Sequence, residues 1–467
     1  MTIVKTRRHL TWTTAQVTLT SMADERRGGT WQNWARTARA TPVAVARPRD
    51  EDEVATLVRS AAGSGTRVRA VGAGHSFTPV AVTDGVQLRL DALDALERVE
   101  SRPDGTTHVT VGAGTRLWQL NELLAQHGLA MRNLGDIDRQ SVAGAISTGT
   151  HGTGARLGGL ATQVVGVRVV RADGEVVEAS PTQDPELFAL ARLGLGSAGV
   201  LVAVTLEVVP AFTLEASEGG ADLRDVLDAL DGPDGLVEGN DHFEFYWFPH
   251  THRTLTKRNN RVPVGTGRPL PRWRHLVDDE LLSNGAFGLT NRVATAVPAV
   301  TPRLNRLAAR SLSARTYTAP SAEVFISPRR VRFREMEYAV PREHLRGVLE
   351  ELDAWVRVTN EPVSFPVEVR FAAADDVWLS TAHGRDTAYV AVHQYLRSPF
   401  RRYFAAAERI VTQVGGRPHW GKLHTLDAER LAALYPRFAD AQRVRAAGDP
   451  SGVFTNPHLD RVLGPLG

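Results

Sequence analysis

Hydrophobic residues recur with two different periods in the first part of the chain. Residues 52–63 place them on one face of a predicted helix with Asp50 as a candidate N-cap, and residues 116–127 repeat this helical spacing. Between residues 43 and 115, short apolar runs broken by Gly and Pro predict strands. The chain therefore opens as a mixture of helices and strands.

A β-hairpin and a buried strand are predicted next. Residues 163–179 form two valine-rich runs around a turn at residues 172–174, which favours a hairpin. Residues 185–193 then show helical spacing, and residues 200–209 form an apolar run typical of a buried strand.

After Pro210 the chain has more aromatic residues and fewer glycine-rich turns. The pattern predicts strands at residues 242–248, 323–340, 363–373 and 386–396. It predicts an irregular stretch over residues 262–303 and helices at residues 341–357, 399–414 and 426–437. This change indicates a domain boundary near residue 212, with an N-terminal extension over residues 1–30, one domain over 31–212 and another over 213–467.

The composition is typical of a soluble globular protein, with 42% hydrophobic and 23% charged residues. No apolar run approaches the roughly 20 residues of a membrane-spanning helix. The 55 basic residues nearly balance the 52 acidic ones and form no aromatic-rich cluster for nucleic acid. The absence of cysteine excludes disulfides, thiol nucleophiles and iron–sulfur clusters. Arg7 and Arg8 lack the apolar segment of an export signal, so we expect a cytoplasmic protein.

The glycines at residues 194–199 match the GxGxxG pattern of nicotinamide-binding proteins. In those proteins the glycine turn follows a strand and opens a helix whose N-terminus faces the pyrophosphate. Here the predicted helix precedes the glycines and the predicted strand follows them. The order therefore argues against a Rossmann site.

Three other glycine-rich turns are candidates for binding a phosphate-bearing cofactor. They lie at residues 71–77, 112–115 and 141–154. In the first, Gly72 and Gly74 allow the backbone to close on a phosphate. His75 follows them, and the residues alone leave four roles open for it: a metal ligand, an acid or base, a cofactor attachment point, or a simple turn residue. The third turn is long and rich in hydroxyls, which is more typical of a functional loop than of a surface connection.

In the second domain, Glu368 and Arg370 lie two residues apart in a strand-like run. Their side chains share a face, so they form either an ordinary salt bridge or a grip on a hydroxyl or carbonyl substrate. His419 and the rare Lys422 form a second cluster. The remaining histidines show no metal-binding spacing, so we expect no metal.

Five motifs occur in a recognisable order: VGAGHSFTPVAVTDG, SVAGAISTGTHGTG, LGSAGVLVAVTLEV, EVRFAAADDVWLS and RPHWGKLHTL. Together they resemble the vanillyl-alcohol-oxidase superfamily of FAD enzymes and, within it, the D-arabinono-1,4-lactone, L-gulono-1,4-lactone and alditol oxidases. The resemblance covers residues 31–466. It implies an α+β fold with a two-subdomain PCMH-type FAD-binding domain, followed by a substrate domain with an antiparallel sheet and flanking helices. The segment from about residue 415 would return to the flavin.

The resemblance also implies the cofactor contacts. The implied residues are Ala70, Val71, Gly72, Ala73, Gly74, His75, Ser76, Gly135, Asp136, Ser141, Gly144, Thr148, Gly149, Thr150, His151, Val200, Val202 and His419. Residues 70–76 would wrap the pyrophosphate, and His75 would be bonded covalently to the 8α-methyl group of FAD. Residues 148–151 would line the adenosine and pyrophosphate.

Catalysis is implied to depend on Glu368, Arg370 and Lys422, because removing a hydride requires a base and a cation at the reacting carbon. Substrate contacts would come from Glu335, His393 and Tyr395. Glu335, Tyr395 and the pair Gly135 and Asp136 depart from the alditol oxidase pattern, which favours lactones over open-chain polyols.

The expected reaction is oxidation of C2 of an aldono-1,4-lactone, with O2 as the acceptor and hydrogen peroxide as a product. Gly135, which stands in place of a bulkier residue, favours a path for oxygen to the flavin. An alditol oxidase and a lactone dehydrogenase are the alternatives. The expected partners are a small sugar lactone or polyol and O2, with no nucleic acid and no membrane span. The sequence does not determine the oligomeric state, although a monomer is slightly favoured.

Overall fold

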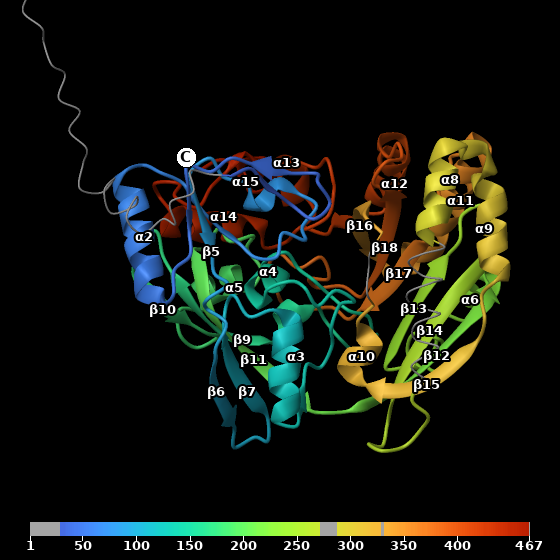
Figure 1. The fold of residues 1–467 in the computed structure, drawn as a ribbon, viewed down its shortest axis with the longest axis horizontal. Helices are drawn as coiled ribbons and strands as arrows, with labels where there is room; N and C mark the ends of the chain where they lie inside the picture. Colours follow the sequence, from blue (N-terminus) through green and yellow to red (C-terminus); the bar gives the residue numbers. More distant parts are fainter. Residues whose placement is uncertain (1–28, 271–286, 328–330, 467) are drawn as a thin grey trace, which may run out of the picture.

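The computed structural model describes residues 29–270, 287–327 and 331–466. Two lobes lie side by side, one built around the blue and green strands β3–β11 and the other around the yellow and orange strands β12–β18 (Figure 1). Both lobes combine sheets with helices, so the α+β prediction is confirmed.

The first lobe contains a parallel sheet in the order β3-β5-β4 and an antiparallel sheet in the order β10-β9-β11-β7-β6. A short pair, β1 and β2, precedes them, and β8 pairs with the end of β11. The strands are β1 (Trp31–Gln32), β2 (Arg39–Ala40), β3 (Ala44–Ala46), β4 (Val68–Val71), β5 (Val86–Arg89), β6 (Leu96–Ser101), β7 (Thr107–Gly112), β8 (Leu129–Ala130), β9 (Val164–Val170), β10 (Val176–Ala179) and β11 (Val200–Pro210). The helices are α2 (Glu51–Gly63), α3 (Leu117–Gln126), α4 (Val142–Ser147) and α5 (Pro185–Ala191).

The second lobe is an eight-stranded antiparallel sheet in the order β15-β12-β14-β13-β17-β18-β16-β19. Its strands are β12 (Thr213–Asp222), β13 (His242–Trp247), β14 (Arg253–Val262), β15 (Arg315–Pro320), β16 (Phe333–Pro341), β17 (Val367–Ala372), β18 (Thr387–Tyr395) and β19 (Arg417–Pro418). Its helices are α6 (Leu223–Asp228), α8 (Phe287–Ala296), α9 (Thr301–Arg310), α10 (Ser321–Phe325), α11 (Leu345–Thr359) and α12 (Arg401–Gln413).

The C-terminal segment returns to the first lobe. Its helices α13 (Ala428–Ala432), α14 (Phe438–Gly448) and α15 (Pro457–Leu463), drawn in red, lie beside the blue N-terminal elements (Figure 1). The Val68 amide donates a hydrogen bond to Val453 (2.7 Å), and the Phe77 amide donates one to Gly421 (2.7 Å). The last part of the chain therefore helps to build the first lobe.

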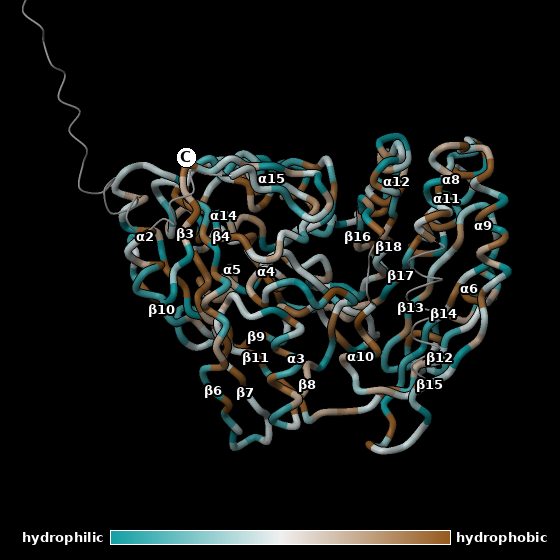
Figure 2. The backbone as a smooth tube through the Cα atoms, in the orientation of Figure 1, coloured by the Kyte–Doolittle hydropathy of each residue, from teal (hydrophilic) through white to brown (hydrophobic). Residues whose placement is uncertain are grey.

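A single hydrophobic cluster joins the two lobes, from Val54 and Val169 in the first to Val369 and Phe404 in the second. Hydrophobic residues are concentrated on the interior strands, such as β9 and β11, whereas the outer end of α12 is polar (Figure 2). Among the described residues, no helix is long and apolar enough to cross a membrane.

Several predicted elements are confirmed. The Asp50 side chain caps α2 by accepting from the Glu53 amide, and the hairpin of β9 and β10 turns around residues 172–174 as expected. The first sheet ends with β11 at Pro210, and the eight-stranded sheet begins with β12 at Thr213.

Other predicted elements are wrong in their extent. The helix expected at 426–437 is interrupted near Pro436, whose missing amide and ring disfavour a helix interior, and α13 and α14 lie on either side. The strand expected from residue 323 starts only at Phe333, because α10 occupies the first residues. The stretch expected to be irregular contains α8, while residues 271–286 lie outside the described residues.

Candidate active site

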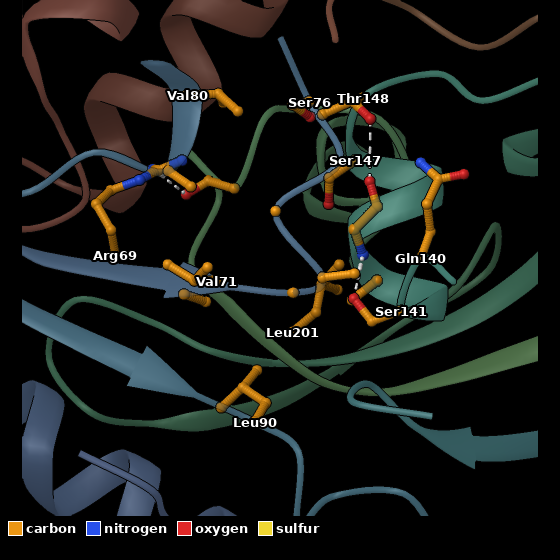
Figure 3. Close-up of a pocket in the computed structure, with 18 of the residues that line it drawn as sticks. Arg69, Val71, Ser76, Val80, Leu90, Gln140, Ser141, Ser147, Thr148 and Leu201 are labelled. Atoms are coloured by element: carbon orange, nitrogen blue, oxygen red, sulfur yellow. Dashed lines mark hydrogen bonds between the residues drawn. The ribbon is translucent and has the colours of Figure 1, made fainter. Parts of the chain in front are cut away.

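The first lobe contains a cavity, which we call the cofactor cavity because most of the residues expected to bind the cofactor line it. Its walls come from the turn that follows β4, from α4 and from the glycine turn before β11 (Figure 3). Much of this wall is backbone, because glycine and alanine dominate these three segments.

Gly72 shows why the wall must be free of side chains. A Cβ atom at this position would lie 2.3 Å from Ser141 Oγ, so only glycine lets the turn approach α4 this closely. Ser141 itself caps α4, because its hydroxyl accepts from the Gly144 amide (3.2 Å). The result is a long cradle lined by backbone and hydroxyl groups, which fits a cofactor such as FAD.

Most of the predicted cofactor residues line this cavity. They are Ala70, Val71, Gly72, Ala73, Gly74, His75, Ser76, Ser141, Gly144 and Thr148. Gly149 and the side chains of Val200 and Val202 do not line it; Leu201 does. The Val202 carbonyl accepts from the Ala113 amide (2.9 Å), so it is already engaged.

The glycine turn at residues 194–199 also lines the cavity, although it is not a Rossmann fingerprint. Helix α5 precedes it and strand β11 follows it, as the sequence predicts. The turn therefore forms a close-packed wall of the cofactor cavity.

His75 lies where this cavity meets a second one. Its ring stacks on Trp34, with 5.8 Å between ring centroids. Burial, followed by the positive charges of Lys422 and Arg116, lowers the pKa of His75 to about 4. The imidazole is therefore neutral near pH 7 and keeps a lone pair for bond formation.

The second cavity adjoins the first through His75, Ser76, Gln140 and Thr148, which line both. In contrast to the first, it is lined mainly by ionisable side chains. Besides His75, these are Asp136, His151, Glu335, Glu337, Glu368, Arg370, His393, His419 and Lys422. We call it the polar cavity.

Glu368 and Arg370 form a buried ion pair on the wall of the polar cavity. Both project from the same face of β17, and Arg370 Nη2 lies 2.6 Å from Glu368 Oε1. Arg370 also pairs with Glu244 (2.9 Å) and faces Asp136 (3.6 Å). Although burial alone lowers the pKa of Arg370, these carboxylates raise it well above its usual value. The pair is therefore not the exposed salt bridge that the spacing alone allows.

Glu244 and its partner Lys257 were not identified from the sequence. They are opposite each other on β13 and β14, with 2.9 Å between Lys257 Nζ and Glu244 Oε1. Burial raises the pKa of Glu244, but Lys257 and Arg370 outweigh it and lower the value to about 2. The Tyr246 hydroxyl donates to Glu244 (3.1 Å) and Glu368 (3.3 Å). The sequence HFEFYW at residues 242–247 carries one signal for this site, because side chains alternate between the two faces of a strand and Glu244 and Tyr246 therefore share a face.

A second group joins Glu335, His393 and Lys422. Glu335 lies opposite His393 on β16 and β18, with 3.5 Å between Oε1 and His393 Nε2, and it forms an ion pair with Lys422. Burial opposes ionisation of Glu335, yet Lys422 and His393 hold its pKa below the ordinary value. His393 Nε2 also lies 3.9 Å from Glu368 Oε2, so the two groups are adjacent.

His151 contributes to the polar cavity instead of the cavity lined by Ser141. Its Nε2 lies 3.2 Å from Glu337 Oε1, and its ring stacks on Tyr389 with 3.5 Å between centroids. Glu337 was missed, although it shares a strand face with Glu335 two residues earlier. Burial raises the pKa of Glu337, but the adjacent His151 outweighs this effect and lowers the pKa to about 2.

His419 completes this group from the C-terminal segment. Its Nδ1 accepts from the Gly421 amide (3.0 Å), so the neutral ring carries its proton on Nε2. Burial lowers the pKa of His419 to about 4. Among the described residues, His151, Glu337 and His419 are the three whose ligand atoms lie within 4.8 Å of one another. Glu337 is already paired with His151, and we assign the group to hydrogen bonding instead of metal binding.

Two predicted residues lie differently from the expectation. Tyr395 is outside the lining of the polar cavity and packs beside Phe333 and Phe365. Gly135 lines the polar cavity, but a Cβ atom there would lie 3.0 Å from the His151 carbonyl oxygen. Close packing between two loops explains this glycine, which weakens the argument for an oxygen path.

Comparisons with known proteins point to one family. The sequence model described as D-arabinono-1,4-lactone oxidase matches residues 204–462, and the model described as FAD binding domain matches residues 42–180. L-gulono-1,4-lactone dehydrogenase of Mycobacterium tuberculosis is 43% identical over 93% of this chain and 99% of that relative. L-gulonolactone oxidase of Bos taurus is 33% identical over 94% of this chain and 99% of that relative.

A similar fold also occurs in a protein whose sequence is much less similar to this chain. A solved structure titled solvent-stable cholesterol oxidase matches with a TM-score of 0.78 over 94% of this chain and 98% of that one. Its sequence identity is only 20%, so this likeness concerns the fold alone.

Proposed function

The chain belongs to the D-arabinono-1,4-lactone oxidase family of FAD-dependent oxidoreductases, and on that premise we propose that it oxidises the C2 hydroxyl of an aldono-1,4-lactone. FAD held by residues 70–76, Ser141, Gly144 and Thr148 would supply a two-electron acceptor, and oxygen as the final acceptor would yield hydrogen peroxide. The residues of the two cavities bind the lactone, orient it and move its proton. The lobe of residues 31–212 acts as the cofactor domain and that of residues 213–467 as the substrate domain, with the C-terminal segment serving both.

The observation that carries this proposal is the buried ion pair of Glu368 and Arg370 beside the cofactor cavity. Glu368 takes the proton from the C2 hydroxyl, through the oxygen that faces His393 Nε2 at 3.9 Å. Arg370 stabilises the negative charge that develops on the substrate oxygen as the carbonyl forms. A base and a cation thus act on the same carbon without help from solvent.

Charge balance in the polar cavity favours a neutral substrate. Arg370 and Lys422 are both paired with carboxylates, so neither cation is left for a substrate carboxylate. A lactone offers hydroxyl donors to the carboxylates of Glu335 and Glu337 and a neutral carbonyl acceptor to the His393 ring, whereas the open-chain acid would add a charge beside them. Lys422, held by Glu335, orients the ring hydroxyls.

We further propose a covalent bond between His75 and the flavin 8α-methyl carbon. The neutral ring can attack, because its pKa lies near 4. Forming this C–N bond breaks one C–H bond of the methyl group and the N–H bond of the imidazole, and oxygen would take up the two electrons and two protons as hydrogen peroxide. Flavin colour should stay with the acid-denatured parent protein and separate from His75→Ala, while His127→Ala, at an exposed histidine, should retain it.

A lactone dehydrogenase is the second candidate, because the relative with 43% identity is named a dehydrogenase and the packing of Gly135 removes one argument for oxygen access. Assays with L-gulono-1,4-lactone, D-arabinono-1,4-lactone, xylitol and sorbitol separate the candidates. The oxidase proposal expects peroxide from a lactone at a rate matching substrate loss. Turnover with a dye acceptor but no peroxide in air would identify a dehydrogenase. Activity on alditols alone would contradict the lactone assignment.

A further inference from the structure

Arg69 is a buried cation in the wall of the cofactor cavity. It lies in β4, immediately before the turn that begins at Ala70, and its side chain is one of those that line the cavity (Figure 3). Only 4% of the residue is exposed. Burying a charge is costly unless a group of opposite charge compensates it, so its surroundings matter.

The guanidinium of Arg69 is hydrogen-bonded through its two Nη atoms, but within the described part of the chain its buried Nε has no hydrogen-bond partner and its charge has no partner either. It donates to the carbonyls of Leu195 (2.7 Å), Gly196 (3.1 Å) and Phe454 (2.7 Å). It forms no ion pair within 4.0 Å among the residues that the structure describes, in contrast to Arg370. Burial, with repulsion from Arg445, lowers the pKa of Arg69 to about 10, despite some attraction from Asp449.

The cavity as a whole therefore carries an uncompensated positive charge. Its lining contains two permanently charged side chains, Arg69 and Asp91. Asp91 already pairs with Arg116 and with Arg89 (3.6 Å). A ligand with negative charge balances the remaining cation, and in FAD the groups ionised near neutral pH are those of the diphosphate.

The position of Arg69 along the cavity agrees with this. Ser76 and Thr148 line both cavities, so they mark the end where the reacting ring must meet the substrate. Arg69 lies on the opposite side of the cavity from them (Figure 3). The remainder of a long cofactor extends from the ring toward Arg69.

We propose that Arg69 is the charge partner of the FAD diphosphate and at the same time a positioning residue for the wall formed by Leu195 and Gly196. Leu195 adopts a left-handed backbone conformation (φ 57°), which is unfavourable for leucine, and its carbonyl is held by Arg69. One side chain thus links β4, the turn at residues 194–199 and the C-terminal segment to the anionic part of the cofactor.

The test measures binding of FAD, FMN and riboflavin to apoprotein, in a His75→Ala background that allows the flavin to be removed. Arg69→Gln should weaken FAD binding roughly 10- to 100-fold and riboflavin binding less than about 2-fold, because riboflavin has no phosphate. FMN should lie between them. Arg69→Lys should keep the preference for FAD over riboflavin, because it keeps the charge.

Arg445→Gln is the matched control, since Arg445 is buried but pairs with Asp460 (3.4 Å) and does not line the cavity. It should leave the preference for FAD over riboflavin unchanged. Equal weakening of FAD and riboflavin by Arg69→Gln would overturn the charge role and leave only a structural one. If circular dichroism shows that Arg69→Gln does not fold, Arg69→Lys decides: loss of the preference in a folded protein refutes the proposal. No lactone is needed, so the outcome is independent of the proposed reaction.

Discussion

The two adjoining cavities are built from opposite materials. The cofactor cavity is walled mainly by backbone, glycine and alanine, with Arg69 and Asp91 as its charged side chains. The polar cavity is walled by four carboxylates, four histidines, an arginine and a lysine. The first suits a large ligand held by shape and main-chain contacts, whereas the second suits proton transfer at a small one. We therefore expect the first cavity to bind the cofactor and the second to carry out the proton transfer.

The cavities also differ in how the chain assembles them. The cofactor cavity uses continuous segments, such as residues 70–76, whose local turns already determine much of its shape. The polar cavity takes single residues from β16, β17, β18 and the C-terminal segment. Its ionisable groups depend on one another, so substitutions there should affect turnover, while substitutions in the cofactor cavity should affect flavin content.

The largest effect is expected from Arg370→Met. It removes the cation that lies among Glu368, Glu244 and Asp136, which leaves buried carboxylates uncompensated and the developing oxyanion without a partner. We expect kcat/KM for the lactone to fall by roughly 10³-fold or more. Steady-state assays on protein with full flavin content measure this.

Arg409→Met is the control for Arg370→Met, because it breaks only an exposed ion pair with Glu351 (3.1 Å). It should change kcat/KM by less than about 2-fold. Near-parent activity of Arg370→Met at full flavin content would show that the polar cavity does not carry the chemistry.

A smaller effect, of a different kind, is expected from Gly72→Ala. Its added Cβ would lie 2.3 Å from Ser141 Oγ and force the turn away from α4. Flavin affinity in the His75→Ala background should fall roughly 10- to 100-fold, while the KM for lactone of the flavin-loaded fraction stays near that of the parent. Gly63→Ala, where a Cβ meets nothing within 4 Å, is the control. Loss of turnover with unchanged flavin affinity would contradict the division between the cavities.

Glu244→Gln should reduce kcat by roughly 10-fold, because it weakens the link between Arg370 and Lys257 without removing any group that faces the substrate. KM should change less than kcat, since Glu244 is not among the residues that line the polar cavity. Asp353→Asn, at a buried carboxylate paired with Arg357 on α11, provides the comparison. Equal losses in the two variants would assign Glu244 to general stability.

The smallest effect is a change of stability with pH. The pKa of His419 is about 4 in the folded protein and near 6.5 when unfolded, so between these values the unfolded chain binds the extra proton. The free energy of unfolding should therefore fall, by roughly 1–3 kcal/mol from this residue, as the pH falls from about 6.5 to 4. The depressed pKa of Glu337, about 2, adds a further loss below about pH 4.5.

Chemical denaturation across pH 4 to 7 tests this for His419→Gln against the parent protein. The substitution should make the change between pH 6.5 and 4 smaller by the His419 contribution, while the losses from other buried histidines, such as His75, and the loss at lower pH remain. An identical pH dependence in both proteins would show that His419 does not stay neutral in the fold.

The sequence indicated residues that line both cavities, but it did not indicate how the buried charges pair with one another. Strand spacing placed Glu368 and Arg370 on one face, and the glycine pattern located the turn at residues 70–76, because both signals are local. Glu244 and Lys257 meet only through the register of β13 and β14, which no local pattern determines.

His151 illustrates the limit most clearly. Its motif associates it with the glycine-rich cofactor loop, yet its side chain turns to Glu337 on β16 and stacks on Tyr389 on β18. Those contacts require the two lobes to be packed together. The short helix α4 inside the same loop was also missed, because six residues make fewer than two helical turns and show no clear helical period.

The central claim is that a lactone in the polar cavity delivers its electrons to a flavin in the adjoining cavity. Anaerobic mixing of the purified protein with one equivalent of L-gulono-1,4-lactone or D-arabinono-1,4-lactone tests it directly, because the visible absorbance reports the flavin's redox state without any external acceptor. We predict that at least one lactone bleaches the parent protein and leaves Arg370→Met oxidised. A visible spectrum unchanged by both lactones but bleached by xylitol or sorbitol would contradict the account.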